Sequence, residues 1–146
     1  MQAITTENEK QVINYEKCKE CTDKHCVQIC PSGALSIMGK EMSVEDIWEE
    51  VKRDQIFYGK NGGITASGGE PLLQIDFLIE LFRKAKKNGV HTTLDTSGNP
   101  FTREEPYFSK FNELMKYTDL LLLDIKLIDD KAHRELTGCT NENILD

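Results

Sequence analysis

The sequence predicts an α/β fold in which a parallel sheet with helices follows a small cysteine-rich module. Three segments have strand character, namely Ile64–Ser67, Val90–Asp95 and Asp119–Lys126. Amphipathic segments separate them, and alternating strands and helices with short loops are typical of a parallel sheet with right-handed crossovers. Four of the five cysteines are clustered ahead of these segments. We therefore expect two domains, residues 1–40 and residues 41–146.

Composition narrows the class of protein. Of the 146 residues, 38% are hydrophobic and 29% are charged, as in a soluble globular domain. The chain has no apolar run of the length needed to span a bilayer, and its opening residues, MQAITTENEKQ, lack the apolar core of a signal peptide. A net charge of −7 argues against nucleic acid as a partner. We expect a cytoplasmic protein that acts neither on nucleic acid nor at a membrane.

The clustered cysteines have the spacing Cys18-x2-Cys21-x4-Cys26-x3-Cys30 and are followed at once by Pro31. The common bacterial ferredoxin spacing is C-x2-C-x2-C-x3-C-P, so the first and last spacings and the proline agree, while the middle spacing is longer. An odd number of cysteines in a cytosolic chain favours metal binding over a disulfide framework. The spacing therefore predicts a ferredoxin-like segment whose four thiolates hold one 4Fe–4S cluster.

Other interpretations of the cysteine cluster remain open. Four thiolates at short spacing also make a tetrahedral zinc site, and His25 beside Cys26 is a further candidate ligand. A cluster held by three of the four cysteines would leave one iron open, and thiols that bind no metal are the last alternative. Cys139 stands alone near the C-terminus, where we expect a small, partly buried side chain rather than a ligand.

The helices of the second domain are recognised by their starts, stops and apolar faces. Ser43 and Asp46 form a capping sequence ahead of apolar residues at helical spacing. The next amphipathic segment ends at Asn88-Gly89, a helix stop signal. The predicted helices begin at Ser43, cover residues 75–87 and 103–117, and resume after Asp130.

The stretch GGITASGGEP joins the first predicted strand to the helix that follows it. Gly68 and Gly69 let the backbone turn sharply and approach a ligand closely, and Glu70 then lies at the carboxyl end of the strand. Exposed backbone groups beside a carboxylate suit a ligand that carries an ammonium group. The alternative is an ordinary glycine-rich turn between a strand and a helix.

Polar residues end the other two strands as well. VHTTLD ends in Asp95, and DLLLLDIK contains Asp124 and Lys126 after an apolar run that is typical of a strand buried on both faces. Because ligands bind at the carboxyl ends of parallel strands, these residues and Glu70 are predicted to form one site. The alternative for Asp124 and Lys126 is an internal ion pair at a strand end.

The cysteine cluster, ITASGGEPLLQ, HTTLDTSG and LLLLDIKL together resemble the activating enzymes of glycyl radical enzymes, within the radical SAM superfamily. The resemblance runs from about Lys17 to the C-terminus, with the three strand motifs in order. It implies a partial (β/α) radical-SAM-type barrel of about three parallel strands. It also implies reductive cleavage of S-adenosylmethionine (SAM) to a 5′-deoxyadenosyl radical, which abstracts hydrogen from a glycine of a partner enzyme.

The resemblance implies roles for individual residues. The SGGE motif would hold the methionyl amino group of SAM, with Glu70 as its charge partner. A monovalent-cation site beside the SAM carboxylate would involve Asp95, Thr96, Asp124 and the backbone of Leu122. Lys126 would interact with the polar groups of SAM, and as a point charge it suits a carboxylate. The implied SAM and cation ligands are Ser67, Gly68, Gly69, Glu70, Asp95, Thr96, Asp124 and Lys126.

The implied partners are a glycyl radical enzyme as protein substrate and a flavodoxin- or ferredoxin-type electron donor. Pyruvate formate-lyase and hydroxyphenylacetate decarboxylase both fit as targets. The ferredoxin-like segment resembles an insert that some members carry, and it points away from the simplest formate-lyase activators.

The chain departs from the family in lacking the C-x3-C-x2-C motif, whose three thiolates leave one iron open for SAM. No catalytic residue is therefore assigned, and we expect an internal piece of a longer enzyme that is inactive alone. Its open sheet edges predict self-association. Two alternatives are a ferredoxin-like electron-transfer or SAM-binding module of a multi-chain assembly, and a zinc-stabilised interaction domain.

Overall fold

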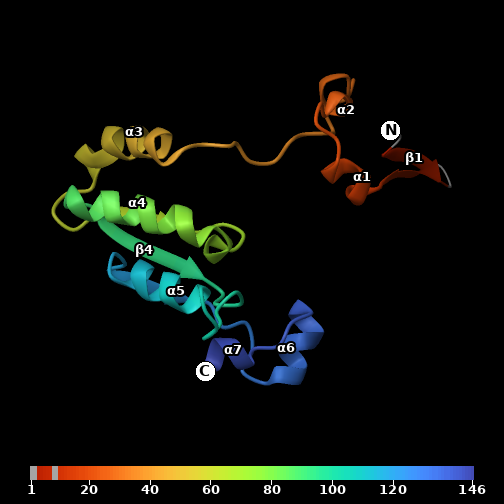
Figure 1. Ribbon diagram of the computed structural model, residues 1–146. Helices are drawn as coiled ribbons and strands as arrows, with labels where there is room; N and C mark the ends of the chain where they lie inside the picture. Colours follow the sequence, from red (N-terminus) through yellow and green to blue (C-terminus); the bar gives the residue numbers. More distant parts are fainter. Residues whose placement is uncertain (1–2, 8–9) are drawn as a thin grey trace. The chain divides into compact units, whose positions relative to one another are not determined.

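The computed structural model describes residues 3–7 and 10–146, which form two compact units, Met1–Glu41 and Met42–Asp146 (Figure 1). None of the helices in these residues has the length and apolar character needed to cross a bilayer.

The first unit contains an antiparallel hairpin followed by two short helices. Strand β1 (Ile4–Glu7) pairs with β2 (Lys10–Ile13), and helices α1 (Tyr15–Lys19) and α2 (His25–Gln28) carry two of the cysteines. The side chain of Asn14 caps α1 by accepting a hydrogen bond from the backbone N–H of Lys17, 3.1 Å away. No described residue of this unit is buried, so its described part contains no hydrophobic core.

The second unit contains the predicted parallel sheet, with strands in the order β3, β4, β5. The strands are β3 (Gly63–Ala66), β4 (His91–Thr96) and β5 (Leu120–Leu123). The α/β fold class with three parallel strands is thereby confirmed. Gly63 has a steric reason to be glycine, because a Cβ atom there would lie 1.9 Å from the carbonyl oxygen of His91.

Helices join the strands, and their boundaries follow from capping and from the apolar pattern. The hydroxyl of Ser43 and the carboxylate of Asp46 form the predicted capping box at the start of α3. Helix α4 has the predicted bounds, whereas α5 starts four residues later than predicted, directly after Pro106. The helical segments are α3 (Val44–Asp54), η1 (Gln55–Phe57), η2 (Pro71–Gln74), α4 (Ile75–Lys87), α5 (Tyr107–Met115), α6 (Asp130–Thr137) and α7 (Glu142–Leu145).

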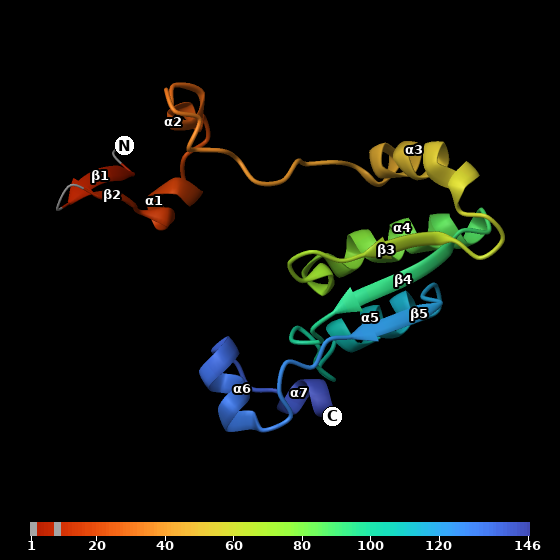
Figure 2. The ribbon, with the colours of Figure 1, turned by 180° about the vertical axis from the view of Figure 1, so that it is seen from behind.

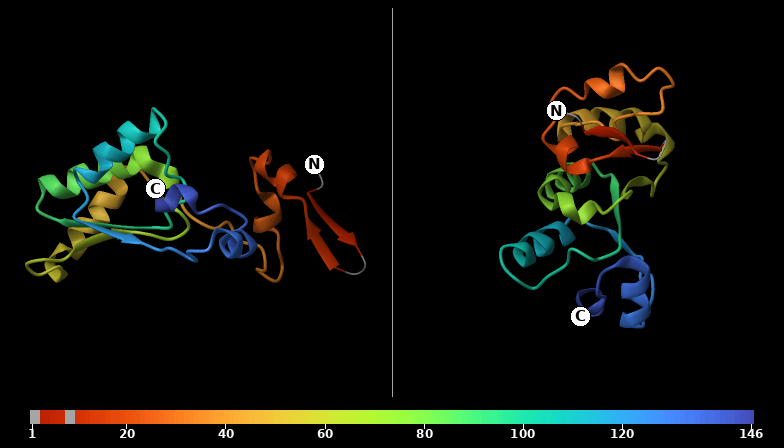
Figure 3. Two further views of the ribbon diagram at one scale, coloured as in Figure 1. Left: turned by 90° about the horizontal axis from the view of Figure 1, so that it is seen from below. Right: turned by 90° about the vertical axis from the view of Figure 1, so that its right-hand side faces the viewer.

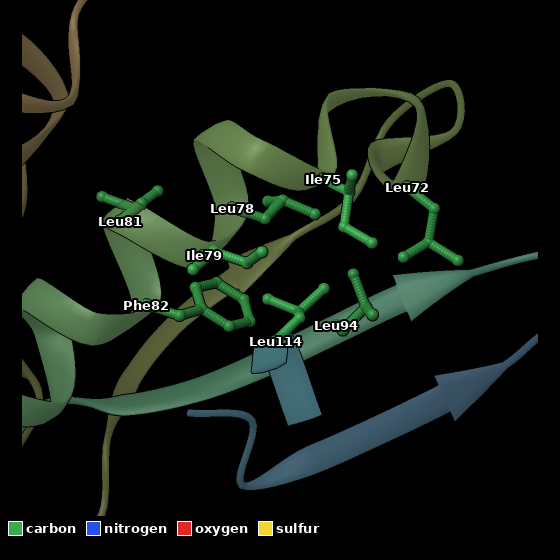
Figure 4. Close-up of a cluster of buried hydrophobic side chains, with 8 residues drawn as sticks. All are labelled: Leu72, Ile75, Leu78, Ile79, Leu81, Phe82, Leu94 and Leu114. Carbon is green, nitrogen blue, oxygen red and sulfur yellow. The ribbon is translucent and has the colours of Figure 1, made fainter. Parts of the chain in front are cut away.

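The core of the second unit lies between the sheet and helices α4 and α5. Phe82, Leu94 and Leu114 are completely buried there, each from a different element. Figure 4 shows Ile79 and Phe82 of α4 lying between that helix and β4, next to Leu114 of α5. The eight core residues are Leu72, Ile75, Leu78, Ile79, Leu81, Phe82, Leu94 and Leu114. A second cluster of Trp48, Val51, Ala85 and Val90 packs α3 against α4.

The helices α4 and α5 cover only one face of the sheet. Figure 2 shows the three strands in front of these helices, and the left view of Figure 3 shows the sheet edge-on with the helices on one side. The four leucines of β5 are 41–45% exposed, so the prediction of a strand buried on both faces was wrong. The reason is that β5 is an edge strand of a sheet whose second face is uncovered in the described chain.

Candidate functional site

The turn after β3 presents exposed backbone at the carboxyl end of the sheet. Gly68 and Gly69 have φ angles of 80° and 68°, in the left-handed region that strongly favours glycine. A Cβ atom on either would meet nothing within 4 Å, so conformation rather than space requires glycine. Ser67 and both glycines are exposed, and η2 begins two residues after the turn. The local sequence therefore produces the sharp, accessible turn that was predicted.

Glu70 is held in place by four hydrogen bonds. Its Oε1 accepts the backbone N–H of Leu72 at 3.0 Å and the hydroxyl of Thr96 at 2.6 Å. Its Oε2 accepts the backbone N–H and the hydroxyl of Ser97, at 3.0 and 2.6 Å. The carboxylate therefore joins the turn after β3 to the end of β4, and it is not free in the solvent.

These hydrogen bonds determine the charge state of Glu70. Burial of the carboxylate favours its neutral form, but the hydroxyls of Ser97 and Thr96 and two backbone N–H groups outweigh burial, so the pKa of Glu70 lies below its usual value. Burial, and then the charge of Glu70, raise the pKa of Tyr107 on α5 to about 12. The Tyr107 hydroxyl is buried with no hydrogen-bond partner among the described residues. Glu70 is thus an anion in a partly apolar setting.

Asp95 and Thr96, both at the end of β4, face opposite sides of the sheet. Leu94 is buried against the helices, and because side chains alternate along a strand, Asp95 points to the uncovered face. Within the described chain its carboxylate has no hydrogen-bond or ion-pair partner. The Thr96 side chain is 4% exposed and donates to Glu70, so it is already committed within the protein.

Asp124 and Lys126 follow β5 and form an ion pair with each other. Their side chains are 52% and 47% exposed, so the pair lies in solvent and contributes little to stability. The backbone N–H of Asp124 donates to the carbonyl oxygen of Thr96 at 2.9 Å, which places Asp124 beside the end of β4. The ion-pair interpretation therefore describes the ligand-free chain, and a ligand carboxylate would have to compete for Lys126.

Ser97 is the residue of this edge that the sequence motifs did not single out. It supplies two of the four hydrogen bonds to Glu70, although it lies 27 positions further along the chain. The motif HTTLDTSG contains it, but a serine before a glycine is typical of an ordinary turn. Only the parallel pairing of β3 and β4 brings this turn against Glu70.

The cysteine module places three of its thiols on one cavity. Cys18, Cys21 and Cys26 line a cavity of about 460 Å³ in the first unit, with His25 among the lining residues. All four clustered cysteines are half-buried, and none forms a disulfide. The described residues contain no group of three His, Cys, Asp or Glu side chains already arranged around a metal position. Four thiols close together in the sequence are nevertheless a donor set that suits an iron–sulfur cluster or zinc.

Two of the thiols have polar neighbours. The hydroxyl of Ser32, 3.6 Å from Sγ of Cys30, and then the backbone of Leu35 lower the pKa of the Cys30 thiol to about 7. The thiol of Cys21 donates to the carboxylate of Asp23 at 3.2 Å. Cys139 is exposed, not partly buried as predicted, because it follows the glycine that ends α6.

Comparison with known proteins gives one family. The radical SAM superfamily matches residues 21–146. The pyruvate formate-lyase-activating enzyme of Listeria monocytogenes is 48% identical over 109 residues, which are 74% of this chain and 44% of that protein. The 4-hydroxyphenylacetate decarboxylase activating enzyme of Clostridium scatologenes is 34% identical over 140 residues, 96% of this chain and 43% of that protein. The chain thus spans less than half the length of these relatives.

Similarity to solved structures includes the following example. It is a domain of pyruvate-formate lyase-activating enzyme from Bacteroides vulgatus, at a TM-score of 0.49 and 34% identity. The similarity covers 58% of this chain and 49% of that one.

Proposed function

This chain belongs to the radical SAM superfamily, and we propose that it supplies the SAM-binding strands of a glycyl radical enzyme activating enzyme. The observation that carries the proposal is the meeting of three motifs at one sheet edge. The SGGE turn, the DTS turn and the DIK segment all follow neighbouring parallel strands. The names of the relatives supply the class of reaction.

The SAM site would use charge at two points. The turn Ser67–Gly69 and Glu70 would receive the methionyl ammonium group, which suits a carboxylate kept ionised by its neighbours. Lys126 would leave its ion pair with Asp124 and form one with the carboxylate of SAM.

The proposed monovalent-cation site lies between the ends of β4 and β5. Asp95 has no partner within the described residues, which leaves both of its oxygens available to a cation. Asp124 and the backbone of Leu122 would complete the oxygen ligands, whereas the Thr96 side chain, which the resemblance also implies, lies on the other face and donates to Glu70. The register that pairs Asp95 with Leu122 supports this grouping.

The cysteine module, residues 1–40 of the proposed domain division, would hold a 4Fe–4S cluster through Cys18, Cys21, Cys26 and Cys30. A module whose described residues are all at least partly exposed would gain its cohesion from metal binding, which is how small metal-binding domains fold. The cluster, when bound, is an electron carrier. Because four thiolates saturate it, it would serve as an auxiliary cluster rather than as the one that binds SAM. A tetrahedral zinc site remains the alternative.

The whole reaction needs groups beyond these residues. Reductive cleavage of SAM to methionine and a 5′-deoxyadenosyl radical takes one electron, which a flavodoxin- or ferredoxin-type donor would supply. The protein substrate would be a glycyl radical enzyme, with pyruvate formate-lyase and 4-hydroxyphenylacetate decarboxylase as the targets that the relatives' names suggest. These partners belong to the cytoplasm, where we place this chain.

SAM binding and SAM cleavage test different parts of the proposal. The chain, reconstituted anaerobically with iron and sulfide and reduced with dithionite, is expected to bind SAM in equilibrium dialysis. It is expected to form no 5′-deoxyadenosine, because its 146 residues contain no C-x3-C-x2-C motif. Glu70→Gln should weaken SAM binding, and Glu80→Gln, on the exposed side of α4, should leave it unchanged.

The other outcomes identify the alternatives. Turnover by the chain alone would mean that the Cys18–Cys30 cluster has an open iron. Cluster incorporation without SAM binding would indicate an electron-transfer module. A colourless protein that retains zinc would indicate an interaction domain.

A further inference from the structure

Glu70 has no free acceptor position in the ligand-free protein. A carboxylate offers about four lone-pair positions, two on each oxygen. Oε1 receives donors from Leu72 and Thr96, and Oε2 receives two donors from Ser97. An ammonium group that approaches this carboxylate finds each position already occupied by a protein N–H or O–H.

The orientation of the two hydroxyls is fixed by the backbone. The Thr96 hydroxyl accepts the N–H of Gly98 at 3.0 Å, and the Ser97 hydroxyl accepts the N–H of Asn99 at 3.3 Å. Because a hydroxyl has a single proton, each one that accepts a backbone N–H turns that proton toward Glu70. Both O···O distances are 2.6 Å, as expected for a hydroxyl that donates to an ionised carboxylate.

The network joins two turns that are far apart in the sequence. Glu70 directly follows the Gly68-Gly69 turn, and Ser97 directly follows β4. Both glycines have left-handed φ angles, and their chain is exposed. The bonds from Thr96 and Ser97 to Glu70 therefore hold this otherwise accessible turn against the end of β4, and Ser97 supplies two of these three.

We propose that Ser97 is a positioning residue of the SAM site, which acts by holding Glu70 and thereby the Ser67–Gly69 backbone in the binding conformation. This inference rests on the proposed function. Glu70 then acts on the ammonium group through its nearby charge and through the turn it fixes, and Ser97 acts through Glu70 without touching the ligand.

Two measurements on the full chain test the role of Ser97. The first is hydrogen exchange of the Leu72 and Ser97 backbone amides, both of which donate to Glu70. Ser97→Ala should speed exchange at both amides. It should not lower the midpoint of thermal unfolding by more than the control substitution Ser109→Ala does. The second is SAM affinity by equilibrium dialysis, which should weaken about tenfold, the effect of one charge-assisted hydrogen bond.

The controls separate positioning from general loss of structure. Ser97→Thr keeps the hydroxyl and should restore both exchange protection and affinity. Ser109→Ala removes an exposed hydroxyl on α5 and should change neither.

Three outcomes would overturn the inference in distinguishable ways. Unchanged exchange in Ser97→Ala would disprove the holding of Glu70. Tighter SAM binding by Ser97→Ala would mean that its hydroxyl competes with the ammonium group. Absence of SAM binding by the unsubstituted chain would overturn the proposed function itself, while the exchange data would still report on Glu70.

Discussion

Thr92 and Asp119 bind each other in both directions across the start of the β4–β5 ladder. The backbone N–H of Thr92 donates to Oδ2 of Asp119 at 2.9 Å, and the backbone N–H of Asp119 donates to the carbonyl oxygen of Thr92 at 2.9 Å. Thr92 is completely buried, and Lys86 of α4 forms an ion pair with Oδ1 of the same carboxylate. One aspartate thus joins both strands and a helix at the edge of the sheet opposite the proposed site.

Asp119→Asn should destabilise the second unit. The substitution removes the ion pair and weakens a hydrogen bond to a buried backbone N–H, which costs roughly 1–2 kcal/mol. Asp76→Asn breaks a similar long-range pair with Lys110, but Asp76 is 71% exposed, so the cost should stay below about 0.5 kcal/mol. Urea unfolding of both variants at neutral pH measures the difference. Equal losses of unfolding free energy in the two variants would show that the contacts of Asp119 stabilise the fold no more than an exposed ion pair does.

The contribution of Asp119 should vanish in acid. Lys86 lowers the pKa of Asp119, burial opposes this, and the backbone of Thr92 lowers it further, with a net shift downward. A carboxyl with a lowered folded-state pKa stabilises the fold above its unfolded value of about 3.9, and loses that effect as the pH falls through the folded-state pKa. The gap in unfolding free energy between the wild type and Asp119→Asn should therefore narrow below about pH 4. A gap that stays constant from neutral pH into acid would contradict this.

Phe82→Ala should be among the most damaging substitutions in the chain. Phe82 is completely buried in the cluster between α4, β4 and α5, and the loss of an aromatic ring there costs about 3–5 kcal/mol. Phe57 is 79% exposed on η1, so Phe57→Ala should change stability by less than about 0.5 kcal/mol. Thermal unfolding followed by circular dichroism compares the two. A tolerated Phe82→Ala would mean that the cluster does not form the core.

Serine substitutions should separate the clustered cysteines from Cys139. Replacing any one of the proposed ligands Cys18, Cys21, Cys26 or Cys30 should lower the iron bound per chain and the broad visible absorbance. Cys139→Ser is the matched control, because Cys139 is an exposed free thiol outside the first unit. Iron and sulfide analysis after anaerobic reconstitution measures the effect. Full cluster content in Cys30→Ser alone would favour ligation by three cysteines.

Two neighbouring leucines of β5 should respond differently to a charge. Leu121 is 41% exposed but lines a small cavity of about 160 Å³ with Phe101 and Phe111, whereas Leu120 is 45% exposed on the uncovered face. Leu120→Lys should reduce self-association in sedimentation velocity at little cost in stability, because charged residues protect exposed strands. Leu121→Lys should destabilise the unit. Self-association that persists in Leu120→Lys would place the contact elsewhere.

Much of the second unit could be predicted because its signals are local. The Ser43–Asp46 capping box and the apolar period of 75–87 depend on neighbours within a few residues, and the structure has both as predicted. The exposure of β5 could not be predicted in this way. A run of four leucines is the same for a central and an edge strand, and only the sheet order distinguishes them.

The candidate site shows the same limit. The glycine turn and the charged strand ends were identified from residue type, and their places at one sheet edge follow from parallel pairing. The contact between Glu70 and Ser97 joins positions 27 apart, and nothing in either local sequence indicates it. The hairpin β1–β2 was also missed, because its strands ITTE and KQVI are short and mostly polar.

The parallel ladder has a consequence for how the chain folds. Gly63 pairs with His91, and Thr93 with Leu120, so each ladder closes a long loop that contains a whole helix. The chain loses entropy when such a loop closes, before the first ladder hydrogen bond can form. Parallel sheets are therefore slow to assemble. Helices α4 and α5 shorten these loops when they form, so their packing is expected to precede strand pairing. During synthesis on a ribosome, β3 would therefore remain unpaired until α4 and β4 had left the exit tunnel.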